Sequence, residues 1–231
     1  AGFTNKTLAH FATRILQAFP SAFAASSKVS TVGNPVRADI ASLPMPAIRY
    51  GERQGQLQVL VLGGSLGAVA LNQLVPEAFA ELEPAARPII RHQAGRKHAA
   101  NAEAVYAKLG VQATVLPFID DMAAEYAWAD VVICRSGALT VSELAAVGVA
   151  SVLIPFPHAV DDHQTANARF LSDAGAALLF QQKDLTVSAF AATLRDLLQR
   201  ETLQLMAEKA RALAETEATT RVVNTILRGE A

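Results

Sequence analysis

Six short apolar segments, each separated from the next by a helical pattern, fill the sequence from residue 57 to residue 180. β-branched residues are common in these segments, as expected of buried strands. We expect strands near 57–62, 88–92, 112–116, 130–134, 151–154 and 176–180, and helices near 67–81, 97–109, 121–128, 140–147 and 163–174. Strands that alternate with helices form parallel sheets covered by helices on both faces. The pattern therefore predicts an α/β fold with a doubly wound parallel sheet.

The order of these strands determines where such a sheet binds a ligand. If it is the common order 3-2-1-4-5-6, the first and fourth strands are neighbours and a crevice opens at their carboxyl ends. The first strand ends at Gly63-Gly64-Ser65-Leu66-Gly67, and the fourth ends at Arg135-Ser136-Gly137. Glycines let the backbone approach a ligand closely, and unpaired N–H groups at a helix start favour an anion. We therefore expect an anion site between the two turns.

Two roles are open for Glu143, which follows the second turn. Thr140-Val141-Ser142-Glu143 fits a capping box, in which the glutamate carboxylate accepts a hydrogen bond from an unpaired backbone N–H. Spacing alone favours this structural role. In the other role, Glu143 lies beside the anion site and accepts hydrogen bonds from vicinal hydroxyls, such as those of a ribose. The second role would make the anion a nucleotide phosphate.

Arg37 and the pair Phe118-Ile119 also have a structural and a functional interpretation each. Arg37 lies in a segment rich in Pro and Gly, where a solvated charge is the simpler interpretation. Phe118-Ile119 follows the third strand, so its backbone N–H and C=O groups would be placed to bind a planar base. Packing in the core is the structural interpretation, and the sequence alone favours it for this pair.

Several classes of function are disfavoured by what the sequence lacks. The glycines after the first strand fit neither a Walker A loop nor G-x-G-x-x-G. An NAD site would have an acidic residue at the end of the second strand, where Arg91-His92-Gln93 stands. The net charge of −1 gives no basic footprint for nucleic acid. We expect no nucleic-acid partner, no cofactor and no metal.

The remaining segments suggest how the chain is divided. Residues 1–32 are too few to bury a core alone, and Pro and Gly then interrupt residues 33–56. We expect residues 1–36 to be the tail of a preceding domain with its linker, 37–215 to be the ligand-binding domain, and 216–231 to be a helix on the preceding domain. The single cysteine, Cys134, suits a reducing compartment. No apolar segment is long enough to span a bilayer, so any membrane contact would be peripheral.

Four glycine-containing motifs follow one another along the chain. They are Gly33-Asn34-Pro35-Val36-Arg37, Gly63-Gly64-Ser65-Leu66-Gly67-Ala68, His92-Gln93-Ala94-Gly95 and Ser136-Gly137-Ala138-Leu139-Thr140-Val141-Ser142-Glu143. Together they resemble the MurG family of GT-B glycosyltransferases, and Pro155-Phe156-Pro157-His158 and residues 162–167 extend the resemblance. It implies two Rossmann-like domains, with this chain as the C-terminal one plus a remnant of the N-terminal one. The implied activity is inverting transfer of N-acetylglucosamine from UDP-GlcNAc to lipid I (undecaprenyl-pyrophosphoryl-MurNAc-pentapeptide), which forms lipid II in peptidoglycan synthesis.

The resemblance also assigns roles to individual residues. Ser65 would bind the diphosphate, the backbone of Ile119 the uracil and Glu143 the ribose hydroxyls. Arg37 would contact the donor, and Gln164 would contact the GlcNAc hydroxyls. The donor site would be completed by Ala138, Leu139, Thr140, Val141 and Ser142, with Gly63, Gly64, Gly67, Gly137 and His163 in support. The family often has glutamine where this chain has Leu66 and His163. No catalytic base can be named, because the resemblance places it in the N-terminal domain.

The implied partners are UDP-GlcNAc as donor and lipid I as acceptor. The implied location is the cytoplasmic side of the bacterial inner membrane, which the protein would reach peripherally through its N-terminal domain. Two alternatives share the fold. One is a nucleotide-sugar-binding subunit of a split GT-B transferase, and the other is a UDP-GlcNAc epimerase.

Overall fold

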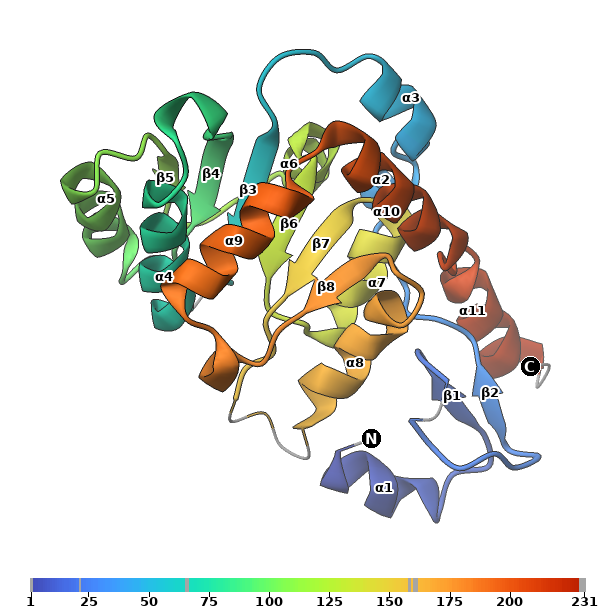
Figure 1. The fold of residues 1–231 in the computed structure, drawn as a ribbon. Helices are drawn as coiled ribbons and strands as arrows, with labels where there is room; N and C mark the ends of the chain where they lie inside the picture. The colour runs from blue at the N-terminus through green and yellow to red at the C-terminus, as the bar shows by residue number, and fades with distance from the viewer. Residues whose placement is uncertain (1, 21, 65–66, 158, 160–161, 229–231) are drawn as a thin grey trace.

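The structure is a computed structural model that describes residues 2–20, 22–64, 67–157, 159 and 162–228. Its centre is a six-stranded sheet in the order β5-β4-β3-β6-β7-β8, in which every neighbouring pair is parallel (Figure 1). The strands are β3 (Gln58–Leu62), β4 (Ile89–Gln93), β5 (Thr114–Leu116), β6 (Val131–Cys134), β7 (Ala150–Leu153) and β8 (Ala177–Leu179). Counted along the chain, this order is 3-2-1-4-5-6. The predicted α/β fold and its strand order are confirmed.

Helices cover both faces of the sheet, because successive side chains of a strand point to opposite sides. Val59 and Val61 face one helical layer, and Leu60 and Leu62 face the other. The first layer contains α4 (Val69–Ala80), α5 (Ala99–Lys108), α9 (Val187–Leu197) and much of α10 (Arg200–Ala212). The second contains α6 (Met122–Trp128), α7 (Ala138–Val147) and α8 (His163–Ser172). Burial on both faces explains why the central strands are apolar throughout.

The ends of several helices agree with the local sequence. Oδ1 of Asp121 accepts a hydrogen bond from the backbone N–H of Ala124 at 2.9 Å and so caps α6. Thr186 caps α9 in the same manner. α7 ends at Gly148, which has the left-handed φ of 65° that a C-terminal glycine supplies. Short 3₁₀ turns occur at η1 (Pro84–Ala86) and η3 (Gln182–Asp184).

The Pro-rich segment before β3 folds onto the main sheet through two short helices, α2 (Ala38–Ala41) and α3 (Pro46–Gly51). Arg49 is buried and donates to the carbonyls of Pro44 and Val147. Nearby, Arg53 donates to the buried carboxylate of Asp130 at 2.6 Å. These contacts hold the segment beside β6 and α7, so it is anchored at several points along its length.

The first and last parts of the chain meet at one corner of the molecule, where Gly33 packs against Glu215 and Ala218 (Figure 1). After α1 (Phe3–Ala9), β1 (Ile15–Gln17) and β2 (Val29–Thr31) form a separate two-stranded parallel sheet. The last helix is α11 (Ala218–Arg228), on which Ile226 and Leu227 are exposed. The domain limits at residues 36 and 215 stay predictions. None of the helices in the described part of the chain is long and apolar enough to cross a membrane.

Candidate functional site

The predicted crevice lies at the carboxyl ends of β3 and β6, where Leu62 and Cys134 are paired in register. A hollow of about 180 Å³ opens there. It is lined by Leu62, Gly63, Gly64, Gln93, Met122, Tyr126, Cys134, Arg135, Thr140 and Glu143. These residues come from β3, β4, β6, α6 and α7 and from the two turns that follow β3 and β6. The structure therefore brings both glycine-containing turns to one site.

The first turn depends on glycine for two different reasons. Gly64 and Gly67 have φ of 76° and 78°, a region that residues with a side chain rarely adopt. A Cβ atom on Gly67 would also lie 2.4 Å from the carbonyl oxygen of Ala94, whereas one on Gly64 would meet nothing within 4 Å. The turn thus packs closely on the end of β4. Ser65, which we predicted to bind the diphosphate, lies outside the described residues.

The second turn leads directly into α7, whose N-cap is Gly137. Gly137 has no side chain to cap this helix, and the first backbone bond of α7 runs from Val141 N–H to the Gly137 carbonyl. The N–H groups of the first turn therefore have no partner inside the helix and are available to an anion. Thr140 lies in that first turn and lines the crevice.

This start of α7 overturns the capping-box interpretation of Glu143. A capping box needs the threonine at the N-cap, but Thr140 is three residues further on. Glu143 lies one turn deeper in the helix and projects into the crevice. Its Oε2 accepts a hydrogen bond from the phenol of Tyr126 at 2.9 Å. Among the described residues, its other carboxylate oxygen has no hydrogen-bond partner.

The electrostatic surroundings of Glu143 combine opposing effects. Burial is the largest and raises the pKa of the carboxyl group, because it penalises the charged form. The hydrogen bond from Tyr126 and the charge of Arg37 lower this pKa, while Asp39 raises it. Arg37 precedes α2, and its Nε lies 3.8 Å from Oδ1 of Asp39. The structure therefore places the predicted donor contact Arg37 within electrostatic range of Glu143.

Ile119 lies in the loop between β5 and α6, and its side chain is buried in the core. Neither its backbone N–H nor its C=O is paired within the described part of the chain. The preceding Phe118 is partly exposed, and the guanidinium of Arg96 lies 5.1 Å from its ring centroid. Ile119 thus combines a packed side chain with an unpaired backbone, so the structural and functional interpretations are compatible.

Gln164 connects the start of α8 to both neighbouring loops. Its Oε1 accepts from the backbone N–H of Phe156 at 2.9 Å, and its backbone carbonyl accepts from the Ser136 hydroxyl at 2.8 Å. The Asn167 side chain donates to the Ser136 carbonyl at 3.1 Å. These bonds fix the start of α8 to the second glycine turn. His163 is exposed and lines a separate hollow with Ala166 and Phe170, so its supporting role and the contact of Gln164 with the sugar stay predictions.

The other predicted residues of α7 differ in what their side chains reach. Val141 is fully buried in the core, and Ser142 donates to the carbonyl of Ala138 within the helix. Leu139 is exposed. Of the predicted α7 side chains, the crevice is therefore lined by those of Thr140 and Glu143 only.

Several residues that line the crevice were given no individual role from the sequence. Gln93 is 6% exposed and ends β4, within the motif His92-Gln93-Ala94-Gly95 that the sequence had already singled out. Tyr126 is 1% exposed and reaches Glu143 only because α6 lies beside α7, which no local pattern shows. Arg135 also lines the crevice, but it donates to the carbonyls of Ile154 and Pro155. Its role is therefore to hold the adjoining loop.

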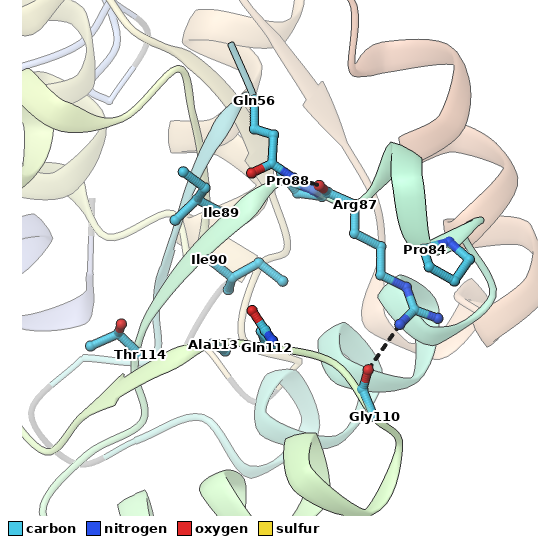
Figure 2. Close-up of a pocket in the computed structure, with 10 residues that line it drawn as sticks. All are labelled: Gln56, Pro84, Arg87, Pro88, Ile89, Ile90, Gly110, Gln112, Ala113 and Thr114. Carbon is cyan, nitrogen blue, oxygen red and sulfur yellow. Dashed lines mark hydrogen bonds between the residues drawn. The ribbon is translucent and has the colours of Figure 1, made fainter.

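A larger hollow of about 580 Å³ lies at the opposite ends of the strands, around the start of β4 (Figure 2). Arg87 is its main charged residue, and Figure 2 shows the bond from its guanidinium to the carbonyl of Gly110. The same side chain also donates to the carbonyls of Leu82 and Ala80. Arg87 thus fastens the surrounding loops, and the volume of this hollow does not make it the site.

Comparison with known proteins extends the structural result. Residues 58–223 match the glycosyltransferase family 28 C-terminal domain. A UDP-N-acetylglucosamine--N-acetylmuramyl-(pentapeptide) pyrophosphoryl-undecaprenol N-acetylglucosamine transferase from Cupriavidus metallidurans is 57% identical over 222 residues, covering 96% of this chain and 61% of the relative. The protein of the same name from Marinobacter nauticus is 51% identical over 225 residues, covering 97% and 62%. The chain thus spans less than two thirds of the length of these curated relatives.

Solved structures agree with this result. The crystal structure of Acinetobacter baumannii MurG matches 98% of this chain, and 63% of its own length, with a TM-score of 0.86 and 44% sequence identity. WaaG, a glycosyltransferase involved in lipopolysaccharide biosynthesis, shares only the fold, with a TM-score of 0.62 and 17% identity. The likeness to MurG confirms the predicted Rossmann-like fold of GT-B type. The chain therefore belongs to glycosyltransferase family 28, and residues 58–223 form the family's C-terminal domain.

Proposed function

We propose that this chain binds UDP-GlcNAc and that the whole protein transfers N-acetylglucosamine from it to lipid I, forming lipid II with inversion. The observation that carries the proposal is the position of Glu143, whose carboxylate faces the crevice one turn beyond the uncapped start of α7. An anion site and an acceptor for vicinal hydroxyls therefore lie side by side, as a nucleoside diphosphate requires. The names of the relatives support this choice of donor and acceptor over an epimerase or a split subunit.

The donor would lie across the ends of the central strands. Its diphosphate would bind the N–H groups at the start of α7, opposite the first glycine turn with Ser65. Glu143 would accept hydrogen bonds from the ribose hydroxyls, and the unpaired backbone of Ile119 would bind the uracil edge. Arg37 would contribute positive charge, and Gln164 would face the GlcNAc hydroxyls.

The chemical role of this half is to stabilise the leaving group. In the transfer, an acceptor hydroxyl oxygen forms a bond to the anomeric carbon while the bond from that carbon to the UDP oxygen breaks. The bonding electrons stay on UDP, and the hydroxyl proton passes to a base elsewhere in the protein. Preorganised N–H groups at the start of α7 favour the charge that develops on the diphosphate. No residue of this chain is assigned as the base.

The acceptor and the membrane are proposed partners of the rest of the protein. We place lipid I on the far side of the crevice, and we place the protein peripherally on the cytoplasmic face of the bacterial inner membrane. The relatives are longer than this chain, which leaves room in them for an acceptor-binding domain. No cofactor or metal is part of the proposal.

Two experiments test the proposed function. Calorimetric titration of this chain should show saturable binding of UDP-GlcNAc, weaker binding of UDP-GalNAc and no binding of NAD. NAD binding as tight as that of UDP-GlcNAc would contradict the nucleotide assignment. The second experiment tests the reaction. The full-length protein should convert lipid I and UDP-GlcNAc to lipid II, and mass spectrometry detects the product. A UDP-linked epimer formed without transfer would contradict it.

A further inference from the structure

Tyr126 is a buried tyrosine whose hydroxyl bonds across two helices. Its side chain is 1% exposed and packs in the core between α6 and α7. The hydroxyl donates to Oε2 of Glu143 at 2.9 Å. Burial and the neighbouring carboxylate both raise the pKa of this phenol, so it keeps its proton and remains a donor. The bond therefore has a fixed direction, from Tyr126 to Glu143.

This bond restricts a side chain that would otherwise be mobile. A glutamate at a crevice has several rotatable bonds, and ordering such a side chain on binding costs roughly 0.5–1.5 kcal/mol. Tyr126 holds Oε2 before any ligand arrives, while the second oxygen has no partner among the described residues. Each carboxylate oxygen can accept two hydrogen bonds, so both oxygens keep capacity for a diol. The carboxylate is thus ordered in advance and still able to accept.

Tyr126 also acts against the effect of burial on Glu143. Burial favours the neutral acid, which would use one oxygen as a donor and spoil the match to two donating hydroxyls. The Tyr126 hydrogen bond and Arg37 both favour the ionised form, and Asp39 opposes them. An ionised carboxylate is an acceptor only, which suits a vicinal diol.

The position of Tyr126 on α6 links it to a second part of the site. α6 begins just after Ile119, where Asp121 caps the helix through Ala124. The loop proposed to bind the uracil and the tyrosine that holds Glu143 are therefore joined by one short, capped helix. In the proposed complex, α6 would therefore position both the loop that binds the base and the carboxylate that binds the ribose.

From these contacts we infer that Tyr126 is a positioning residue that orders the Glu143 carboxylate for the ribose hydroxyls and makes the site selective for ribonucleotides. The inference rests on the proposed role of Glu143 as the ribose acceptor. A purely structural alternative is that Glu143 merely satisfies a buried hydroxyl. The two differ in what they predict for nucleotides that lack the hydroxyls.

The test measures affinities for UDP and for 2′,3′-dideoxy-UDP by calorimetry in wild type, Tyr126→Phe and Glu143→Ala. Wild type should prefer UDP by about ten-fold or more, as expected for hydrogen bonds to a charged group. Tyr126→Phe should weaken UDP binding several-fold, leave dideoxy-UDP binding unchanged and so shrink the preference. Glu143→Ala should abolish the preference. Tyr126→Phe removes one oxygen atom and keeps the ring in the core, and thermal unfolding checks that it folds.

Tyr106→Phe is the matched control. Tyr106 is equally buried, and its hydroxyl bonds to Nδ1 of His92 at 3.0 Å, outside the lining of the crevice. This variant should keep the wild-type preference for UDP. If wild type shows no preference, the proposed ribose contact of Glu143 fails. If wild type shows it and Tyr126→Phe keeps it in full, or loses affinity equally for both nucleotides, the positioning role of Tyr126 is overturned while the Glu143 contact stands.

Discussion

Leu62 and Cys134 are paired in register as the last residues of β3 and β6, so the two turns of the crevice start from adjacent backbone positions. Both residues are buried in the same core layer beneath α6 and α7. Parallel strands in a packed core are rigid supports, and site residues placed at their ends keep a defined geometry. The described residues at the start of each turn therefore have a rigid support.

The first prediction concerns the close packing of the first turn. Gly67→Ala should lower the free energy of unfolding by about 3 kcal/mol, because it adds left-handed strain and a clash with the Ala94 carbonyl. It should also weaken UDP-GlcNAc binding at least ten-fold. Gly64→Ala is the control, since it has a similar φ and open space around its Cβ, and should cost only about 1 kcal/mol. Equal unfolding free energies for the two variants in urea would contradict this account.

The second prediction concerns the ion cluster around Asp130. This carboxylate is 1% exposed and accepts from Arg53 at 2.6 Å and from the backbone N–H of Gln58 at 2.8 Å. Asp130→Ala leaves the Arg53 charge without its partner and should lower the free energy of unfolding by about 3–5 kcal/mol. Arg221→Ala breaks the exposed pair with Glu215 and should cost less than about 1 kcal/mol. Urea unfolding measures the free energy of unfolding of both variants. Similar losses in the two would contradict the claim that the buried cluster around Asp130 stabilises the fold more than the exposed pair does.

The third prediction is a pH dependence of donor binding. Burial raises the pKa of Glu143 above the ordinary glutamate range, and the diol requires the ionised form. The affinity for UDP-GlcNAc should therefore fall as pH falls through this raised pKa, starting at a higher pH than for an exposed glutamate. The same shift makes protonation of Glu143 favour the folded state, so this group does not itself destabilise the fold in acid, and circular dichroism at each pH checks that the protein stays folded.

Glu143→Gln provides the control for that pH dependence, because it keeps the shape and cannot titrate. Its affinity should be weaker at neutral pH and should lose the acid-dependent step. Tyr126, Arg37 and Asp39 surround the carboxyl group and remain unchanged in the variant. A step of the same size in Glu143→Gln would show that another group causes it.

The fourth prediction concerns His92, which is fully buried beside Tyr106. Burial lowers the pKa of its imidazole from 6.5 to about 4. Below about pH 6.5 the imidazole of the unfolded chain binds a proton, whereas that of the folded chain stays neutral. The free energy of unfolding therefore decreases as the pH is lowered from about 6.5 to about 4. The loss amounts to about 3 kcal/mol at full extent. In His92→Gln, urea unfolding between pH 7 and pH 4 should show a shallower decline, and an unchanged decline would exclude His92 as the cause.

The sheet could be predicted from the sequence because each central strand is buried on both faces. Val59 and Val61 pack against one helical layer and Leu60 packs against the other, so the strand must be apolar at every position. Such continuous apolar segments can be recognised from the sequence alone. The two short helices before β3, α2 and α3, could not be predicted from the sequence in the same way. Arg49 is buried there and donates to the carbonyl of Val147, which is distant in sequence. Pro and Gly interrupt the periodicity that would otherwise reveal the short helices.

The site was only partly predictable for a similar reason. The two glycine turns follow from the strand order, but the start of α7 does not, because Gly137 gives none of the side-chain signal that marks a helix start. That missing signal made Thr140 resemble a cap. The contact between Tyr126 and Glu143 depends on how α6 lies beside α7, which is a property of packing and not of local sequence.

The measurement that tests the central claim most directly is calorimetric titration of UDP-GlcNAc into wild type and Glu143→Ala. Wild type should bind saturably, and Glu143→Ala should bind at least ten-fold more weakly while its circular dichroism stays that of a folded protein. Glu103→Ala, an exposed change on α5, should bind like wild type. Equal affinities for wild type and Glu143→Ala would contradict the claim that this carboxylate holds the donor.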